Sequence, residues 1–356
     1  MNNFLDKAKG SILGLALGDA LGTTLEFKPK DSYEHITDMH GGGPFNLNAG
    51  QWTDDTAMMI GLAESLIQSG KNNPIAQLYR YHAWYYHGVY SCTGKCFDIG
   101  NTVRAAITKF DRSKEGFCGS TAPQSAGNGS LMRLAPIPLF FYQSSLAVLF
   151  KEAEISSKTT HGEARCIQAC QLMSYYLQRI YTSDINLSKQ NILAITHELT
   201  TLSTNWHQDI NDILNGKYLD KTRDEIFGTG YVVQSLEAAL WCFVHSDNFE
   251  QGALLAANLG DDADTTAAIY GQLAGAYYGY EKLPQHWLAK LAWKEELEQI
   301  ACGLVDASNN QKNEITQAKI NQISKNIAKA ILHAGIDSGS PLTAKQIKKF
   351  TSNFIK

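Results

Sequence analysis

The 356-residue sequence lacks three features that would place it in a specialised class of protein. It has no excess of positive charge, because its net charge is -4 at pH 7, whereas a general nucleic-acid binder needs a basic surface for phosphate contacts. Its cysteines number seven, an odd total that does not suit a disulfide framework and fits small buried hydrophobes in a reducing cytosol. It has no apolar run long enough to span a membrane. We therefore expect neither a nucleic-acid partner nor a membrane.

The N-terminal segment bears on the expected location. Lys7 and Lys9 precede a short apolar run, which faintly resembles a secretory signal. However, Asp19 ends that run early and Glu26 follows. We therefore favour a cytoplasmic protein. With 44% hydrophobic and 19% charged residues, the chain can bury a large core as one big domain or two smaller ones.

Helical patterns dominate the sequence, and strands are hard to find. The expected helices cover residues 4–25, 54–69, 74–90, 98–110, 144–157, 162–181, 188–203, 232–244, 249–257 and 287–304, with a further helix after residue 262. Residues 91–96 and 116–129 read as loops. Composition changes after residue 304. The segment 305–356 is rich in lysine, and Ile320, Ile323, Ile327 and Ile331 form one amphipathic stripe, so we interpret it as a helical C-terminal appendage to a domain spanning 1–304.

Glycines recur at every fourth position in the first expected helix, at Gly10, Gly14, Gly18 and Gly22. With about 3.6 residues per turn they share one face, and each interior glycine costs up to about 1 kcal/mol relative to alanine. The helix after residue 262 shows the same spacing at Gly271, Gly275 and Gly279, with Ala267 one turn earlier. Membrane helices also use such faces, but the nearby aspartates argue against that interpretation. We predict that these two helices pack unusually close together.

Two short acidic stretches stand out, each followed by an apolar helix. They are residues 51–56 (QWTDDT) and residues 258–266 (NLGDDADTT). Carboxylates and threonine hydroxyls are hard oxygen ligands, which suit magnesium, manganese or calcium. One alternative is that Thr53 is merely a helix N-cap and that Asp54 and Asp55 are favoured by the helix dipole. The later stretch exceeds what one cap requires, so we predict that the two stretches meet around metal ions, as in two-metal hydrolases.

Other patterns leave alternatives open. Cys92 with Cys96, or Cys166 with Cys170, has the spacing of a zinc-ligand pair, and a cysteine nucleophile is a further alternative. His161 lies at an expected helix start and is either a ligand contact or a polar cap. Residues 127–130 (GNGS) form either a simple turn or a loop whose backbone N–H groups bind a phosphate.

Taken together and in this order, seven separated blocks resemble the ADP-ribosylglycohydrolase family, which includes dinitrogenase-reductase-activating glycohydrolases and ADP-ribosyl-acceptor hydrolases. The blocks are residues 14–22 (GLALGDALG) with Glu26, 52–56 (WTDDT), 98–102 (DIGNT), 127–133 (GNGSLMR), 160–161 (TH), 230–233 (GYVV) and 260–265 (GDDADT). The resemblance covers about residues 5–304. It implies an all-α orthogonal multi-helix bundle with a binuclear magnesium or manganese centre.

The resemblance also implies roles for individual residues. The implied metal ligands are Thr53, Asp54, Asp55, Asp262, Asp264 and Thr265. Asp261 is implied to be an acid just outside that ligand set. Glu26 matches an acid that lies on a mobile loop over the metals in some members. The residues implied to hold ADP-ribose are Asn101, Gly127, Asn128, Gly129, Ser130, His161 and Tyr231.

The implied activity is hydrolysis of the glycosidic bond between ADP-ribose and a modified protein side chain, with arginine as the expected acceptor and free ADP-ribose as the product. We expect ionised Asp55 or Asp264 to stabilise positive charge on the sugar, and Glu26 or a metal-bound aspartate to transfer the proton. The alternatives are a different ADP-ribose conjugate on serine, a nucleobase or a small molecule, a phosphohydrolase, and a catalytically silent ADP-ribose-binding or structural member.

Overall fold

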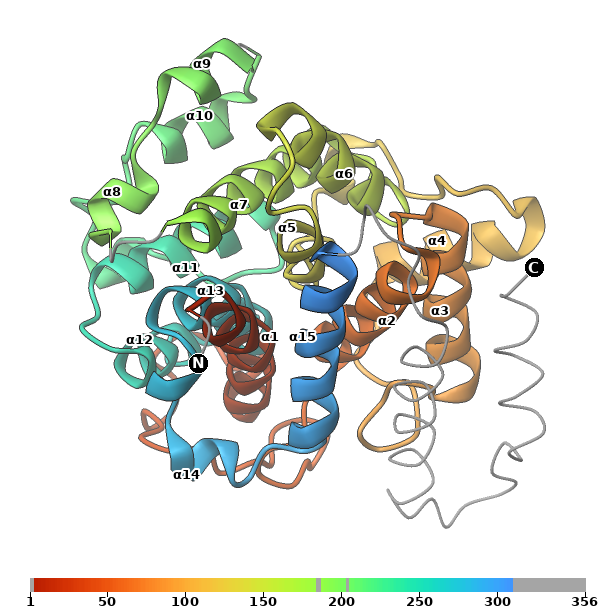
Figure 1. The fold of residues 1–356 in the computed structure, drawn as a ribbon. Coiled ribbons are helices and arrows are strands. Elements are labelled where there is room, and N and C mark those ends of the chain that lie inside the picture. Colours follow the sequence, from red (N-terminus) through yellow and green to blue (C-terminus); the bar gives the residue numbers. More distant parts are fainter. Residues whose placement is uncertain (1–2, 184–186, 203–204, 310–356) are drawn as a thin grey trace.

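A computed structural model describes residues 3–183, 187–202 and 205–309, and the prediction of an amphipathic appendage lies largely outside these residues. Within them the protein is helical, with isolated bridges in place of strands, which confirms the predicted all-α class (Figure 1). The helices are α1 (Asn3–Gly22), α2 (Asp54–Ser69), α3 (Pro74–His87), α4 (Asn101–Ser113), α5 (Pro136–Phe140), α6 (Leu146–Lys158), α7 (Ala164–Thr182), α8 (Lys189–Leu193), α9 (His197–Leu202), α10 (Gln208–Leu214), α11 (Val232–Val244), α12 (Phe249–Ala257), α13 (Ala263–Tyr278), α14 (Gln285–Leu288) and α15 (Lys294–Asn309).

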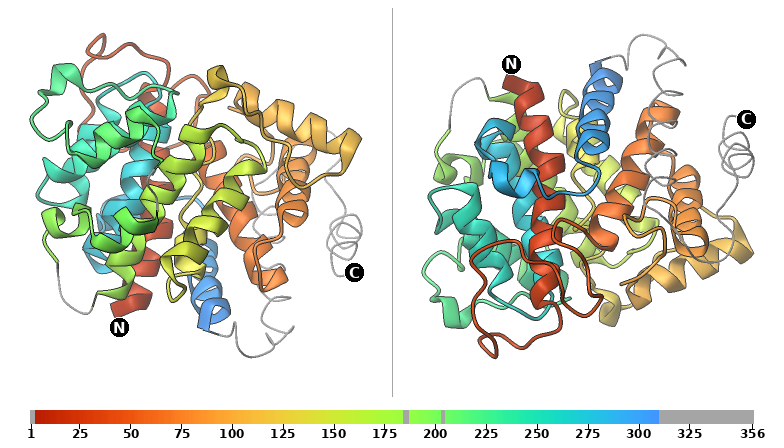
Figure 2. Two further views of the ribbon diagram at one scale, coloured as in Figure 1. Left: turned by 90° about the horizontal axis from the view of Figure 1, so that it is seen from above. Right: turned by 90° about the horizontal axis from the view of Figure 1, so that it is seen from below.

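The predicted close packing of the glycine-bearing helices is confirmed between α1 and α13, which run side by side through the molecule (Figures 1 and 2). A Cβ atom built on Gly14 would lie 2.4 Å from the carbonyl oxygen of Gly271, and one on Gly18 would lie 2.0 Å from that of Ala267. These distances leave no room for a side chain, so the two backbones touch along the glycine face. Gly279 is an exception, because it follows the end of α13 and faces Asp6 instead.

This antiparallel contact fixes where the two helices end relative to each other. A Cβ atom on Gly22, the last residue of α1, would lie 2.3 Å from the carbonyl oxygen of Ala263, the first residue of α13. Asp19 on α1 and the segment that carries Glu26 therefore lie beside Asp264. The glycine spacing thus brings together acidic groups that are far apart in the sequence.

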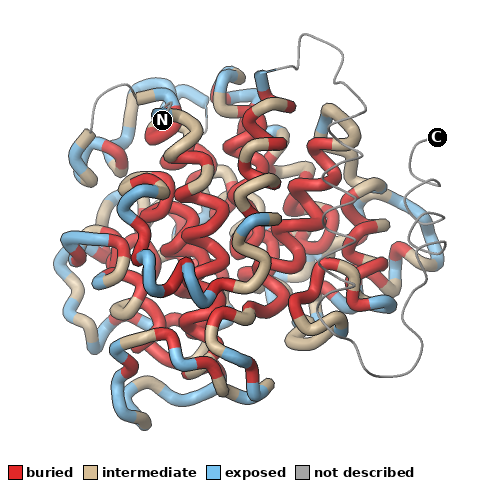
Figure 3. The backbone as a smooth tube through the Cα atoms, turned by 60° about the horizontal axis from the view of Figure 1, so that its bottom comes forward, coloured by how far each residue is buried: buried red, intermediate tan, exposed pale blue. Residues whose placement is uncertain are grey.

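The remaining helices surround this pair. α2 and α15 pack against one side, and α11 and α12 against the other, while α7 contacts α1, α11 and α13. The short helices α8–α10 lie at one end of the bundle and α3–α4 at the opposite end (Figure 1). The helices at the centre are buried almost throughout, and the exposed residues lie mostly on the peripheral loops (Figure 3).

Several expected boundaries were wrong. The helix expected at 98–110 begins at Asn101, because Asp98 has a positive φ of 59°. The helix expected at 188–203 is two short helices, α8 and α9. The helix expected at 287–304 is interrupted at Trp293, whose φ is 56°. The short helices α5 and α10 were not expected. At Asp98 and Trp293 a residue other than glycine adopts a left-handed conformation, and between α8 and α9 the chain turns. None of these positions carries the glycine or proline that would have predicted a helix end.

In the part of the chain that the structure describes, no helix combines the length and the apolar character that crossing a membrane would require.

Candidate active site

The start of α2 is held by a carboxylate from another helix. Asp19 of α1 is fully buried and accepts hydrogen bonds from the backbone N–H groups of Thr53 (2.8 Å) and Thr56 (3.0 Å) and from both of their hydroxyls. Asp19 therefore caps the helix in the place that the Thr53 side chain was expected to fill. The Thr53 hydroxyl instead lies within hydrogen-bonding distance of Asp264 Oδ2 (3.1 Å), so the cap-only interpretation of this stretch does not describe its geometry.

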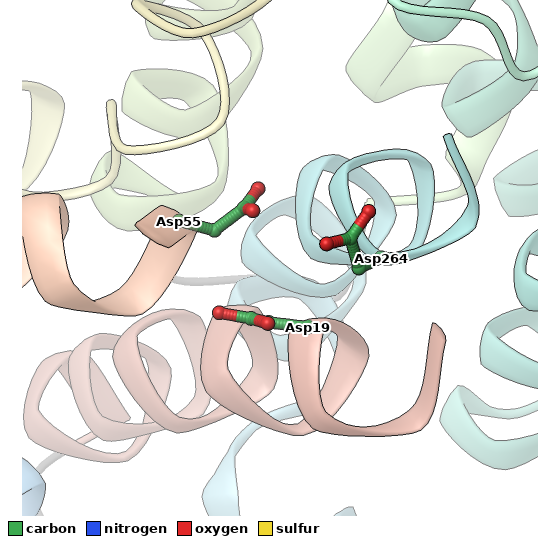
Figure 4. A group of neighbouring side chains, drawn as sticks. All are labelled: Asp19, Asp55 and Asp264. Carbon is green, nitrogen blue, oxygen red and sulfur yellow. The ribbon is translucent and has the colours of Figure 1, made fainter. Parts of the chain in front are cut away.

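The two acidic stretches meet, as the sequence predicted. The Thr265 hydroxyl, at the start of α13, lies 3.4 Å from Oδ2 of Asp55, which belongs to α2. The carboxylates of Asp19, Asp55 and Asp264 come from three different helices and lie close together (Figure 4). One oxygen from each of these three residues lies within 4.8 Å of the others. A second group of the same kind joins Glu26, Asp98 and Asp264.

Burial and mutual repulsion raise the pKa of these carboxyl groups. For Asp54, Asp55 and Asp264 the largest cause is desolvation, and neighbouring carboxylates add to it. The same causes raise the pKa of Glu26 to about 10, and desolvation raises that of Asp98 to about 7. Carboxyl groups gathered in this way are unfavourable as anions unless positive charge accompanies them.

The donor set fits a divalent cation that prefers oxygen. Among the described residues, Asp55 Oδ1 and Glu26 Oε2 are buried and accept no hydrogen bond from a protein group. A buried carboxylate oxygen without a donor costs free energy, and a hard metal ion would satisfy it. The structure therefore contains clustered acidic groups that could hold metal.

A cavity of about 710 Å³ opens above this cluster. Asp54, Asp262 and Thr265 line it together with Glu26 and Asp98. Thr53, Asp55 and Asp264 are not among the lining residues and are buried close by, within the acidic cluster. Asn101, Gly127, Asn128, Gly129 and His161, all expected at the substrate, also line the cavity.

The loop at 127–129 is fixed to the acidic cluster through Asn128. Its side-chain amide donates hydrogen bonds to Asp262 Oδ2 (2.7 Å) and to the Ser235 hydroxyl (2.9 Å), and its backbone N–H donates to the Gly230 carbonyl (3.2 Å). A Cβ atom on Gly129 would lie 2.8 Å from Cε1 of His161, so a larger residue there would displace the ring. The loop therefore presents backbone atoms to the cavity.

The His161 ring packs against this loop. Its Nδ1 lies 2.8 Å from the Thr160 hydroxyl, and burial, with a contribution from Arg133, lowers its pKa to about 3. The ring is therefore neutral at pH 7 and can act as a hydrogen-bonding group without carrying charge. Arg133 links the 127–129 loop to the segment before His161. Its guanidinium donates hydrogen bonds to the Gly129 carbonyl (2.5 Å) and to the Thr160 hydroxyl (2.7 Å).

Two residues expected at the substrate do not line the cavity. The buried Ser130 hydroxyl bonds to that of Ser157 (2.9 Å) and accepts a contact from Cys170 Sγ (3.5 Å). The Tyr231 hydroxyl accepts from Arg165 (3.0 Å) and donates to Asp209. The Tyr231 backbone instead pairs with Gly127 through an isolated bridge. Their expected substrate contacts stay predictions.

Sequence reasoning gave no role to Asp19 or Asp98. Both belong to blocks that carried the family resemblance, but neither lies in an acidic run. The position of Asp19 in a glycine-rich apolar helix could have indicated a role, because burying an unpaired carboxylate in such a helix is unfavourable. Asp98 adopts its left-handed conformation beside Gly100 and reaches Glu26 and Asp264.

The cysteines do not form a metal or nucleophile site. All seven are free, and burial raises the pKa of Cys92 and of Cys96 to about 12 and that of Cys170 to about 11. A thiol with a raised pKa is a poor nucleophile at neutral pH. Within the described chain, the potential metal-binding groups contain only aspartate and glutamate.

Comparisons with known proteins agree with the resemblance seen in the sequence. A family model described as ADP-ribosylglycohydrolase matches residues 1–314. The chain belongs to the ADP-ribosylglycohydrolase family. The ADP-ribosylarginine hydrolase Tri1 of Pseudomonas putida is 44% identical to it over 304 residues, which is 85% of this chain and 78% of that protein. The ADP-ribosyl-[dinitrogen reductase] glycohydrolase of Rhodospirillum rubrum is 30% identical over 306 residues, covering 82% of this chain and 92% of that one.

A solved structure supports the family fold. A chain in the structure of an ADP-ribosylglycohydrolase-related protein complex is 35% identical to this one and superposes on it with a TM-score of 0.75. The match includes 86% of this chain and 100% of that chain. The acidic cluster and the cavity above it therefore lie in a bundle of the ADP-ribosylglycohydrolase type.

Proposed function

We propose that this protein is a metal-dependent hydrolase that releases ADP-ribose from an ADP-ribosylated arginine side chain of a substrate protein, in the cytoplasm. The observation that carries the proposal is the convergence of two acidic helix starts at one cavity. It occurs in a chain that is 44% identical to an ADP-ribosylarginine hydrolase.

The residues proposed to hold two magnesium or manganese ions are Thr53, Asp54, Asp55, Asp262, Asp264 and Thr265, all of them oxygen donors at or next to the cavity. Such ions, when bound, supply positive charge that offsets the carboxylates and lowers the pKa of a bound water. Asp19 is proposed to position this set, because it fixes the backbone of Thr53 and the first turn of α2.

The chain's own residues are proposed to divide the remaining chemistry. Glu26 lies on the cavity wall with a buried, unpartnered oxygen, so it is placed to move a proton to or from the bond that breaks. Asp55 or Asp264, once ionised, stabilises the positive charge that grows on the ribose ring as that bond lengthens. Asp98 contacts Glu26 and influences its protonation.

ADP-ribose is proposed to lie along the wall formed by the 127–129 loop. Gly127 and Gly129 line this wall without side chains, which lets a diphosphate approach the backbone closely. Neutral His161 and Asn101 provide side-chain hydrogen bonds at the same wall.

The test is release of free ADP-ribose from matched peptides that carry ADP-ribose on arginine or on serine, each assayed with magnesium, manganese or EDTA. We expect metal-dependent release from the arginine peptide. Release from the serine peptide alone would contradict the acceptor assignment, and equal release in EDTA would contradict the metal assignment. Liberation of phosphate in place of ADP-ribose would favour the phosphohydrolase alternative.

A further inference from the structure

Phe27 is an exposed aromatic residue that directly follows a buried segment. It is 66% exposed, whereas Leu25 and Glu26 just before it are 2% and 3% exposed. Phe27 lines the cavity above the acidic cluster. A phenyl group left open to solvent contributes little to folding, because its apolar surface is not removed from water. Its position on the cavity wall therefore calls for an explanation other than core packing.

The backbone fixes Phe27 in this position. Its φ is 62°, an uncommon conformation for a residue other than glycine. Its N–H donates to the Asp261 carbonyl (2.7 Å), and the Asp261 N–H donates to the Lys28 carbonyl (2.8 Å). Asp261 also has a positive φ, of 53°. The Phe45 ring packs against the Phe27 ring in an edge-to-face arrangement, with the two ring centroids 6.3 Å apart. Phe27 and Asp261 are therefore held as neighbours on one part of the wall.

This part of the wall is acidic. Asp261 lines the cavity beside Phe27, and Glu26, Asp98 and Asp262 line it as well, with the pKa of those last three carboxyl groups raised by burial. The Asp261 side chain is only partly buried, and Lys30 interacts with it electrostatically. Acidic groups do not suit a phosphate, whereas an aromatic ring close to a carboxylate suits a planar cation. A guanidinium both stacks on rings and binds carboxylates through paired N–H groups.

We propose that the Phe27 ring and the Asp261 carboxylate form a subsite for the guanidinium group of the arginine acceptor. The proposal rests on the proposed function and adds to it the residues that select arginine. The ring stacks on the guanidinium plane, and Asp261 accepts its N–H groups. The subsite thus holds the acceptor beside Glu26, while ADP-ribose occupies the wall formed by the 127–129 loop.

The variants Phe27→Leu and Asp261→Asn test the subsite, and Phe27→Trp tests whether an aromatic face restores it. Phe117→Leu is the matched control, because Phe117 is 50% exposed and does not line this cavity. The substrate is an ADP-ribosyl-arginine peptide. We expect Phe27→Leu and Asp261→Asn each to raise KM by about tenfold, the effect of losing one partly desolvated cation contact. The tryptophan and control variants should stay within about twofold of the wild type.

Two binding measurements separate the subsite from a general effect. Affinity for free ADP-ribose, which lacks a guanidinium, should be unchanged in Phe27→Leu and Asp261→Asn. Methylguanidinium should inhibit the wild type more strongly than methylammonium, and both variants should lose that difference. Weaker ADP-ribose binding, or KM values equal to those of the Phe117→Leu control, would overturn the subsite while leaving the proposed function intact. A wild type inactive on the arginine peptide contradicts the proposed function itself, whatever the variants do.

Discussion

The contact between α1 and α13 consists of uncharged backbone, whereas the cluster at its end consists of acidic side chains. Along the contact, glycines such as Gly14 and Gly271 bring two uncharged backbones together. At its end, Asp19, Asp55 and Asp264 bring carboxylates together, with burial raising the pKa of each. The first arrangement stabilises the fold by close packing, and the second opposes folding unless positive charge is supplied. The backbone contact therefore holds in place acidic groups that would otherwise separate.

The largest expected effect comes from widening the contact. In Gly18→Val the new Cβ atom would lie 2.0 Å from the Ala267 carbonyl oxygen, so the two backbones must move apart. We expect a loss of about 3 kcal/mol or more of folding free energy, and loss of activity with it. Urea unfolding followed by circular dichroism measures the change.

Gly61→Ala in α2 is the control for that variant. A Cβ atom on Gly61 has its nearest neighbour at 3.4 Å, an ordinary contact, so the substitution should be neutral or stabilise the helix by up to about 1 kcal/mol. If Gly18→Val were as stable as Gly61→Ala, close backbone contact would not be what supports the site.

Removing a charge from the cluster should have the opposite effect on stability. Asp264→Asn keeps an oxygen that can accept the Thr265 N–H, as Asp264 Oδ1 does at 2.7 Å, and it removes a buried negative charge. In EDTA we expect this variant to be more stable than the wild type by about 1 kcal/mol or more, because replacing a buried acidic group that has no positive partner removes an unfavourable burial. It should also lose ADP-ribose release and stabilisation by magnesium or manganese, as should Asp54→Ala.

Thermal unfolding with and without metal distinguishes the outcomes for Asp264→Asn. A variant that remains active, or that is still stabilised by metal as the wild type is, would contradict the proposed ligand set. A variant less stable than the wild type in EDTA would contradict the claim that the cluster opposes folding.

The pH dependence of the metal-free protein probes the same cluster. The folded-state pKa of Asp98 is raised to about 7 and that of Glu26 to about 10, so the folded state retains protons that the unfolded state releases above about pH 4. Stability in EDTA should therefore fall as pH rises from about 5 to 8, because the unfolded state binds fewer protons. Saturating metal should reduce this slope. A pH-independent unfolding midpoint in EDTA would contradict the raised pKa values.

Both the close helix contact and the meeting of the acidic stretches could be predicted from the sequence. The four-residue glycine spacing maps directly onto one helix face, so the close packing of α1 and α13 could be predicted. The pairing of Gly14 with Gly271 and of Gly18 with Ala267 came from the structure. The meeting of the two acidic stretches followed from repulsion, since carboxylates gathered in one place need a shared cation. The structure confirms both contacts, while the identity of the ions stays a prediction.

Other parts of the site depend on contacts that no local pattern encodes. Asp19 binds Thr53 and Thr56 across more than thirty positions, and one aspartate in an apolar helix does not indicate its partner. The outward position of Phe27 depends on a left-handed backbone held by Asp261. Whether the Ser130 hydroxyl faces the cavity or the core depends on the turn of the loop, which tertiary packing decides.

The smallest expected effect concerns an ion pair on the loop that follows Phe27. Its exposed carboxyl group has a lowered pKa, whereas the buried carboxyl groups of the cluster have raised pKa values. Asp31 is exposed and accepts two hydrogen bonds from Arg223, each 2.8 Å long, which lower its pKa below the usual range. A carboxyl with a lowered folded-state pKa contributes stability above about pH 4 and loses it only as pH falls further. Asp31→Asn should therefore shift the unfolding midpoint by no more than about one or two degrees, by the same amount at pH 5 and pH 8. A shift that grew between those two values would mean that the loop is coupled to the protonation of the acidic cluster, and that the two regions do not respond to pH separately.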